Sequence, residues 1–344
     1  MKYLFAVVFA VFSFSTIGQT EYTIEYQGFS RTYILYAPAG STQGMPLVFN
    51  LHGYTSSANQ QMTLTGMNDA ADANGFAVVY AQGTPDSFGI NHWNAWQDPT
   101  DVDDIGFISA LRSYLIDSYG FDANRVYSCG FSNGGIMSYA IACQLSDEFA
   151  AIASVAGSMN TDMMSQCTPS RSFPIMELHG DADPVVAIGG TTQGAGFGEL
   201  LSVADVISYW TDFNACSDPI TTELPNTNLL DFCNVVKTEY ADCDESVRVW
   251  NYLVESGGHT WPGAFPTFIV GNTNQDIDAN EEIWDFFNLF SLPQSIESNA
   301  QTSAKQLVAV YDLTGRVLSL NQLLAGELYV YRFSDGSIEK RVIQ

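Results

Sequence analysis

The sequence predicts an α/β fold, in which helices cover both faces of a mainly parallel sheet and a small β module follows at the C-terminus. Continuous apolar runs, typical of strands buried on both faces, alternate with segments of helical periodicity, and this alternation indicates the parallel sheet. After residue 306 the pattern changes to alternating apolar and polar residues between Gly and Asp turns, which indicates the β module. With 46% hydrophobic residues, the 344-residue chain can bury one large core and a small appendage.

The expected elements follow one another along the chain. Residues 22–38 alternate apolar and polar side chains around Gly28, which predicts an N-terminal hairpin. Buried strands are expected at the apolar runs 46–53, 75–83, 125–131, 149–157, 173–180 and 247–255. Helices are expected at the segments of helical period 101–120, 132–145, 200–213 and 280–290.

The two ends of the chain suggest export and a separate module. Residues 1–18 combine Lys2, an apolar run and a small-residue end, which predicts a cleaved signal peptide. The apolar run is shorter than the about 20 residues that span a bilayer, so no integral membrane span is expected. We therefore expect a secreted or cell-surface protein with one domain at 19–292, a polar linker at 293–306 and the β module at 307–344.

Charge and cysteine content exclude some classes of partner. A formal net charge of −26 would repel a phosphate backbone, so nucleic acid is not expected as a partner. All six cysteines follow the signal, where oxidising conditions favour disulfides, and their pairing stays open at this point. No close CxxC pair is present and only four histidines occur, so no metal site is predicted. The acidic pair Asp103–Asp104 fits a helix start better than a metal site.

The segment GFSNG, residues 130–134, carries the clearest chemical signal. It is a GxSxG motif that stands after an expected strand and before an expected helix. Such a tight turn exposes the hydroxyl of Ser132, and the flanking glycines remove side chains that would collide there. We therefore predict Ser132 as a nucleophile; the alternative is a Gly-rich turn with a serine N-cap.

A neutral serine needs a base, and the base needs an acid that fixes its tautomer. In this architecture the partners follow in the order Ser, acid, His. Asp181 and Asp183 both lie in the loop after a strand, and loop position alone does not separate them. The one histidine beyond this loop is His259, in a Gly- and Pro-rich loop after another strand, and it is the predicted base.

An acyl-transfer site also needs donors for the developing oxyanion, each contributing about 3 kcal/mol. The backbone N–H of Asn133 directly follows the nucleophile. The loop after an earlier strand offers the N–H of Tyr54 as the second donor. His52 is expected to shape that loop together with Gly53 rather than to transfer protons.

From Arg31 to Phe290, these motifs together resemble the secreted esterases of the polyhydroxybutyrate-depolymerase and feruloyl-esterase kind, in carbohydrate esterase family one of the α/β-hydrolases. The resemblance rests on LHGYTSSANQ, WNAW, DVDDIGFI, DANRVYSCGFSNGG, FAAIASVAG, HGDADPVV and GGHTWPG, in family order. It implies the α/β-hydrolase fold, the acid at Asp183, the base at His259 and no cofactor.

The resemblance also bears on substrate and disulfides. Family members cleave hydroxycinnamoyl or acetyl esters of plant cell-wall polysaccharide, or short-chain polyesters, and an ester substrate of one of these kinds is implied here. Trp93, Trp96 and Trp261 are candidates to stack on a phenolic ring or sugar; ordinary loop packing is the alternative. The implied disulfides are Cys216–Cys243 and Cys143–Cys167, with Cys129 and Cys233 unassigned.

The β module at 307–344 resembles a type IX secretion sorting domain through VYDLTGRVL, GELYVYRFSDG and a basic end. It lacks the family's Asn-Pro-containing first motif, so a plain accessory module is the alternative to a contact with secretion machinery.

For the whole chain we predict an exported serine carboxylesterase that works through an acyl-enzyme. A peptidase on the same fold and a non-catalytic carbohydrate-binding protein are the alternatives.

Overall fold

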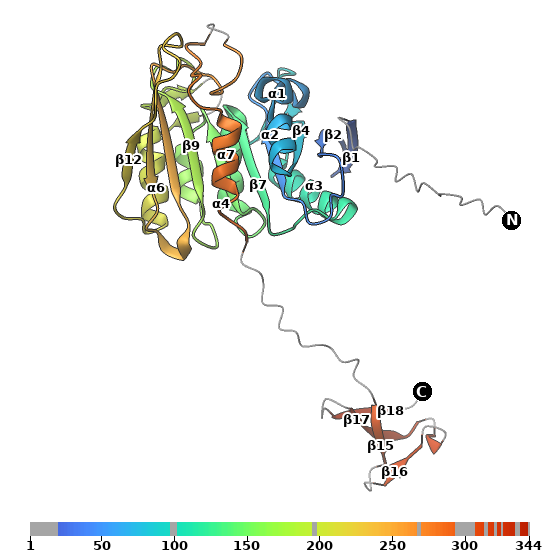
Figure 1. The fold of residues 1–344 in the computed structure, drawn as a ribbon. Coiled ribbons are helices and arrows are strands. Elements are labelled where there is room, and N and C mark those ends of the chain that lie inside the picture. The colour runs from blue at the N-terminus through green and yellow to red at the C-terminus, as the bar shows by residue number, and fades with distance from the viewer. Residues whose placement is uncertain are drawn as a thin grey trace, which may run out of the picture. The chain divides into compact units, whose positions relative to one another are not determined.

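The computed structural model describes residues 20–96, 102–194, 198–266, 270–292, 307–312, 316–319, 322–324, 326–333 and 338–342. The expected signal peptide and linker lie outside these residues. The chain divides into two compact units, Met1–Leu292 and Pro293–Gln344 (Figure 1). Over the described residues, no helix is both long enough and apolar enough to cross a membrane.

A ten-stranded sheet forms the centre of the first unit. In chain order its strands are β1 Thr20–Tyr26, β2 Phe29–Tyr36, β3 Leu47–Leu51, β4 Ala77–Ala81, β7 Val126–Phe131, β8 Ala151–Val155, β9 Ile175–Gly180, β12 Ile220–Glu223, β13 Asn234–Tyr240 and β14 Val249–Glu255. Across the sheet they follow the order β1-β2-β4-β3-β7-β8-β9-β14-β13-β12. Every neighbouring pair from β4 to β14 is parallel, and the strands outside this block are antiparallel. The predicted mainly parallel sheet and the N-terminal hairpin are confirmed.

Helices cover both faces of this sheet, as predicted (Figure 1). They are α1 Ala58–Thr65, α2 Met67–Asn74, α3 Asp104–Tyr119, α4 Asn133–Gln144, α5 Thr161–Gln166, α6 Val203–Phe213 and α7 Ala279–Phe287, with a 3₁₀ turn η1 at Asp244–Ser246. One buried cluster joins the sheet to α3, α4, α5 and α6, and a second joins its other face to α1, α2 and α7. Short two-stranded ladders lie in the loops, formed by β5 Thr84–Pro85 with β6 Asn91–His92 and by β10 Thr191–Gly194 with β11 Gly198–Leu200.

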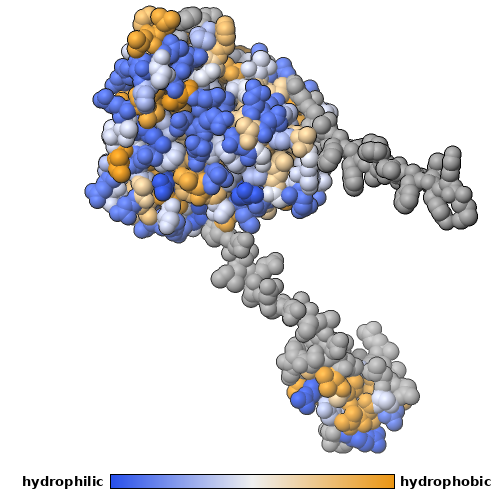
Figure 2. All heavy atoms as spheres, viewed as in Figure 1, coloured by the Kyte–Doolittle hydropathy of each residue, from blue (hydrophilic) through white to orange (hydrophobic). Residues whose placement is uncertain are grey.

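Acidic side chains begin two of these helices. Asp103 is the N-cap of α3, where its Oδ1 accepts from the Gly106 N–H at 2.8 Å, so the predicted helix start is confirmed. Asp278 caps α7 by accepting from the Asn280 N–H at 2.8 Å. With 38 acidic against 12 basic residues, the chain carries a large excess of negative charge, and the face drawn in Figure 2 is largely hydrophilic with scattered apolar side chains.

The second unit is a four-stranded antiparallel sheet in the order β16-β15-β17-β18, made from β15 Leu307–Tyr311, β16 Val317–Leu318, β17 Leu328–Phe333 and β18 Ile338–Val342. Its core contains Val310, Tyr329, Tyr331 and Phe333. The predicted small β module is therefore present, while its role in sorting stays a prediction.

Two disulfides close loops on the first unit. Cys143–Cys167 joins the end of α4 to the end of α5, and Cys216–Cys243 joins the segment after α6 to the residue before η1. Both implied pairings are confirmed. Cys129 and Cys233 are buried free thiols, and burial raises the pKa of Cys129 well above its ordinary value.

These pairings predict the result of a thiol titration on the mature protein. Unfolding in denaturant without reductant should expose two titratable thiols per chain, and unfolding with reductant should expose all six. The measurement is a colorimetric thiol assay with peptide mapping of the alkylated sites. Alkylation of Cys216 or Cys143 without reductant would contradict the pairing.

Candidate active site

Ser132 stands at the junction between β7, which ends at Phe131, and α4, which begins at Asn133. Its backbone has φ 57° and ψ −118°, a conformation that non-glycine residues rarely adopt. The Ser132 N–H donates to the Val155 carbonyl on β8 at 2.8 Å, and its own carbonyl accepts from Ile136 at 3.0 Å. The serine side chain makes no cap bond to the helix. The predicted strand–serine–helix turn is therefore present in a strained form, with Ser132 7% exposed, and its role as a nucleophile stays a prediction.

The glycines of the motif are required by close backbone contacts. A Cβ on Gly134 would lie 2.1 Å from the Leu51 carbonyl oxygen, and one on Gly130 would lie 2.4 Å from the Gly134 carbonyl. Both contacts involve backbone, which cannot move aside as a flexible side chain can. The tight turn thus depends on the two glycines for its geometry.

Asp183 and His259 are brought together by loops after β9 and β14. His259 Nδ1 lies 2.7 Å from Asp183 Oδ2, and the other carboxylate oxygen accepts from the N–H groups of Val185 at 2.7 Å and Val186 at 2.8 Å. Because a carboxylate accepts, Nδ1 carries a proton, so in the neutral form of the ring Nε2 is the nitrogen with the lone pair that a general base needs. The His259 ring packs against Phe131, with ring centroids 4.7 Å apart, directly beside Ser132 in sequence.

The neighbouring Asp181 has a different role. Its Oδ1 accepts from the Ser256 N–H at 2.6 Å, and its side chain is exposed. The structure thus pairs His259 with Asp183, the acid that the resemblance implies.

The loop after β3 lies against Ser132. A Cβ on Gly53 would lie 3.3 Å from Ser132 Cβ, so the backbone at residues 53–54 runs beside the serine. Buried His52 holds this loop: Nδ1 donates to the Gly53 carbonyl at 2.8 Å, and Nε2 accepts from the Gly83 N–H at 2.9 Å. Burial lowers the pKa of His52 to about 4, which keeps it neutral in this tautomer. The N–H groups of Tyr54 and Asn133 stay predicted oxyanion donors.

Two of the three predicted aromatic contacts are wrong. Trp93 is fully buried, and its indole N–H donates to the His52 carbonyl at 3.0 Å. Trp261 is 1% exposed within the core between the sheet and α7. Neither ring offers a face to a substrate, because both are packed inside the hydrophobic core. Trp96 is partly exposed and donates to Gln166 at 3.4 Å, and its role stays a prediction.

The structure adds two polar groups that sequence reasoning did not single out. The Asn133 side chain makes two hydrogen bonds with the Trp93 backbone: it accepts from the Trp93 N–H at 2.6 Å and donates to the Trp93 carbonyl at 3.1 Å. Glu177 and His179 form a buried pair on β9, with Oε1 and Nδ1 2.9 Å apart. A glutamate and a histidine two residues apart in a strand expected to be buried were the available signal for this pair.

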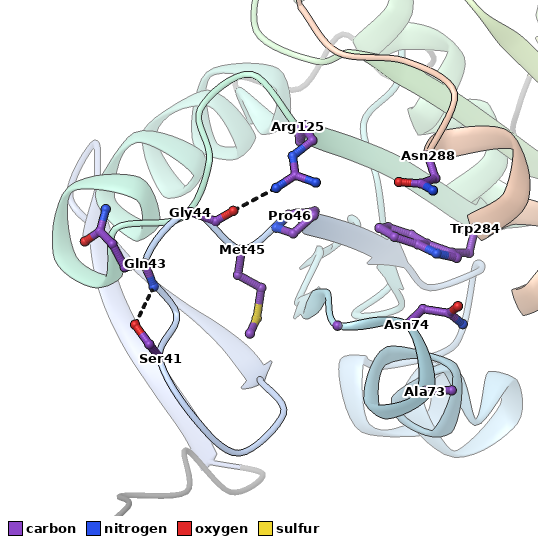
Figure 3. A pocket seen from close by; sticks show the side chains of 11 residues that line it. Ser41, Gln43, Gly44, Met45, Pro46, Ala73, Asn74, Arg125, Trp284 and Asn288 are labelled. Carbon is purple, nitrogen blue, oxygen red and sulfur yellow. Dashed lines mark hydrogen bonds between the residues drawn. The ribbon is translucent and has the colours of Figure 1, made fainter.

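Away from this site, the structure contains a cavity of about 500 Å³ that Ser41, Met45, Asn74, Arg125 and Trp284 help to line (Figure 3). It lies before the first residues of β3, β4 and β7, whereas Ser132 follows the last residue of β7. Within the described ranges, no group of three or more His, Cys, Asp or Glu side chains is arranged to hold a metal ion.

Comparison with known proteins places this chain in a family. The family model described as Esterase PHB depolymerase matches residues 31–208. A putative esterase NocK from Nocardia uniformis subsp. tsuyamanensis is 29% identical over 75% of this chain and 79% of its own length. Feruloyl esterase B from Piromyces equi is 28% identical over 76% of this chain and 46% of its own length. The bifunctional acetylxylan esterase/xylanase XynS20E from Neocallimastix patriciarum is 27% identical over 79% of this chain, and the match spans 35% of that relative.

A solved acetyl xylan esterase from Aspergillus awamori matches the structure with a TM-score of 0.56, at 15% identity over 78% of this chain and 99% of that one. The likeness confirms the predicted α/β-hydrolase fold.

The glycine contacts give a matched pair of substitutions. Gly134→Ala should lower the free energy of unfolding by about 3 kcal/mol or more, because its new methyl group meets backbone. Gly189→Ala is the control, since a Cβ there has no atom within 4 Å. Chemical denaturation measures both, and equal stability of the two variants would contradict the account of the turn.

The lowered pKa of His52 predicts a pH dependence of stability. The unfolded chain binds a proton at His52 below its ordinary pKa of about 6.5, whereas the folded chain binds it only near pH 4. The contribution of neutral His52 to the free energy of unfolding is therefore complete above about pH 6.5. It is lost progressively toward pH 4, by up to about 3 kcal/mol. Urea denaturation across this range should show a shallower decline in His52→Gln than in the parent. Parallel curves would show that His52 titrates as it does when unfolded.

Proposed function

This chain belongs to the Esterase PHB depolymerase family and is a carboxylic ester hydrolase; on that premise, we propose that it is a secreted serine esterase. Its proposed substrates are feruloyl or acetyl esters of plant cell-wall polysaccharide, or short-chain and aromatic polyesters. The observation that carries the proposal is the strained Ser132 turn, together with the 2.7 Å contact between His259 and Asp183.

The proposed reaction follows from the chemistry of these three side chains. His259 Nε2 takes the proton of Ser132 as the hydroxyl attacks the ester carbonyl, and Asp183 stabilises the imidazolium that forms. The proton then passes to the leaving alcohol, and an acyl-enzyme remains on Ser132. Water, deprotonated by His259, cleaves that intermediate and releases the acid.

Charge that develops on the carbonyl oxygen needs donors already in place. The N–H of Asn133 follows the nucleophile at the start of α4, where the helix N-terminus favours negative charge. The N–H of Tyr54 follows Gly53, which lies against Ser132. We assign both as oxyanion donors, each contributing about 3 kcal/mol to the transition state.

The substrate class is supported by the names of the relatives. One relative is named a feruloyl esterase and another an acetylxylan esterase, and the family description refers to PHB depolymerase. Secretion is proposed from the signal-like residues 1–18 and from the disulfides, which persist in oxidising compartments. The C-terminal module is proposed to contact secretion machinery.

Replacement of the nucleophile tests the proposal. Ser132→Ala should lower kcat by a factor on the order of 10³ or more, with the fold intact by circular dichroism. Hydrolysis is measured on methyl ferulate, p-nitrophenyl acetate and a hydroxybutyrate polyester film, with Ser109→Ala on α3 as a matched control that should keep full activity.

Each outcome of this assay separates one function from another. Ser132-dependent release of ferulate would support the cell-wall assignment, and film clearing with little ferulate release would support polyester. Cleavage of peptide anilides but not of the three esters would favour a peptidase. Binding of xylan without any hydrolysis would favour a carbohydrate-binding protein.

A further inference from the structure

Beneath the acid loop, β9 carries a polar pair that the reaction above does not use. Glu177 and His179 are two residues apart, so they point to the same face of the sheet, and each is 1% exposed. Ile175, on the same face, belongs to the core that packs against α3, α4, α5 and α6. Buried charged groups are costly unless each is partnered, so the contacts of the pair indicate its role.

These contacts form one line of side chains that runs from α4, the helix after Ser132, to Asp183. The Tyr139 hydroxyl, on α4, donates to Glu177 Oε2 at 2.8 Å, and Glu177 Oε1 lies 2.9 Å from His179 Nδ1. His179 Nε2 lies 2.8 Å from the Val186 carbonyl oxygen. The same nitrogen is 3.6 Å from Asp183 Oδ2, the oxygen that holds His259.

The acceptors in this line determine where protons lie. A carbonyl oxygen only accepts, so His179 Nε2 carries a proton toward Val186. Nδ1 faces a carboxylate oxygen, so a second proton lies between His179 and Glu177. Burial by itself lowers the pKa of His179, but its hydrogen bond with Glu177 and the charge of that carboxylate outweigh this and raise the pKa. Burial raises the pKa of Glu177, so both shifts keep the proton on the pair.

The surroundings of the pair contribute few charges. Tyr139 faces it from α4, and Asp183 faces it from the loop after β9. On the neighbouring strands the residues in register with the pair are neutral: Asn251 and Ser154 oppose Glu177, and Leu253 opposes His179.

We propose that His179, held protonated by Glu177, is a positioning residue for the catalytic carboxylate. Its Nε2–H holds the Val186 end of the acid loop, and its positive charge lies beside the Asp183 oxygen that binds His259. Through Tyr139 the same line ties this loop to α4, whose first residue follows Ser132. The assignment rests on the proposed serine-esterase function.

The raised pKa values give the inference a pH signature. A group whose pKa is raised by folding contributes its stabilisation at low pH and loses it as the pH rises through the folded value. When the shared proton leaves, the Glu177 carboxylate stays buried opposite the bare Nδ1 of His179. The support for Asp183 then weakens, and kcat should fall on the alkaline side.

Nuclear magnetic resonance tests the protonation directly, without any need for turnover. In protein with ¹⁵N-labelled histidine, both ring nitrogens of His179 should have shifts of protonated nitrogen at a pH just above the ordinary histidine pKa of about 6.5, where an unperturbed histidine is mostly neutral. The signal is assigned by its loss in His179→Gln. A neutral His179 at that pH, with one unprotonated ring nitrogen, would overturn the inference.

Activity profiles test the positioning role. In Glu177→Gln, His179 loses its counter-charge and becomes neutral, so kcat should fall by about 10-fold to 100-fold with KM within about twofold, and the alkaline decline should disappear. Tyr139→Phe should give a smaller loss in the same direction. Tyr252→Phe is the matched control, because its hydroxyl also donates to a glutamate, Glu282, but in the core on the other face of the sheet.

An active parent with unchanged kcat and pH profile in folded Glu177→Gln would overturn this inference and leave the proposed function intact. A parent with no Ser132-dependent hydrolysis would overturn the proposed function instead, and the histidine spectrum would still report on the buried pair.

Discussion

The backbone of Ser132 is the constraint on which the rest of the structure depends. A non-glycine residue at φ 57° costs about 1–3 kcal/mol, so the surroundings must hold it there. The hydrogen bond from its N–H to Val155 and the close packing of Gly134 on the Leu51 carbonyl do so. The strand β7, the helix α4 and the loop after β3 therefore meet at one point, at Ser132.

The parallel sheet places the remaining groups around that point. Neighbouring parallel strands end at the same edge, so loops from β3, β7, β9 and β14 converge although they are far apart in sequence. Asp183 and His259, which are 76 residues apart, meet at 2.7 Å through such loops. Rigid backbone contacts hold each loop, as Val185 and Val186 do for the acid, so that the side chains are oriented before a substrate binds.

Much of this arrangement could be predicted from the sequence, because its determinants are local. The order of Ser132, acid and His259 and the glycines of the turn follow from short motifs with known mechanics. Residue chemistry alone did not separate Asp183 from Asp181, since their difference lies in which loop N–H groups each accepts. Trp93 was assigned to the substrate wrongly, because its burial depends on packing across the sheet. The helices α1 and α2, of eight residues each, are too short to show a clear period.

The most direct test of the account is covalent labelling of the mature protein with an ester-mimicking phosphonate, followed by intact-mass measurement and peptide mapping. A phosphonate reacts with an activated serine and stays attached, so the result does not depend on knowing the natural ester. The account predicts one adduct per chain, on Ser132, and its loss in His259→Ala. Labelling of a different residue, or labelling of Ser132 that is as fast in His259→Ala as in the parent, would contradict it.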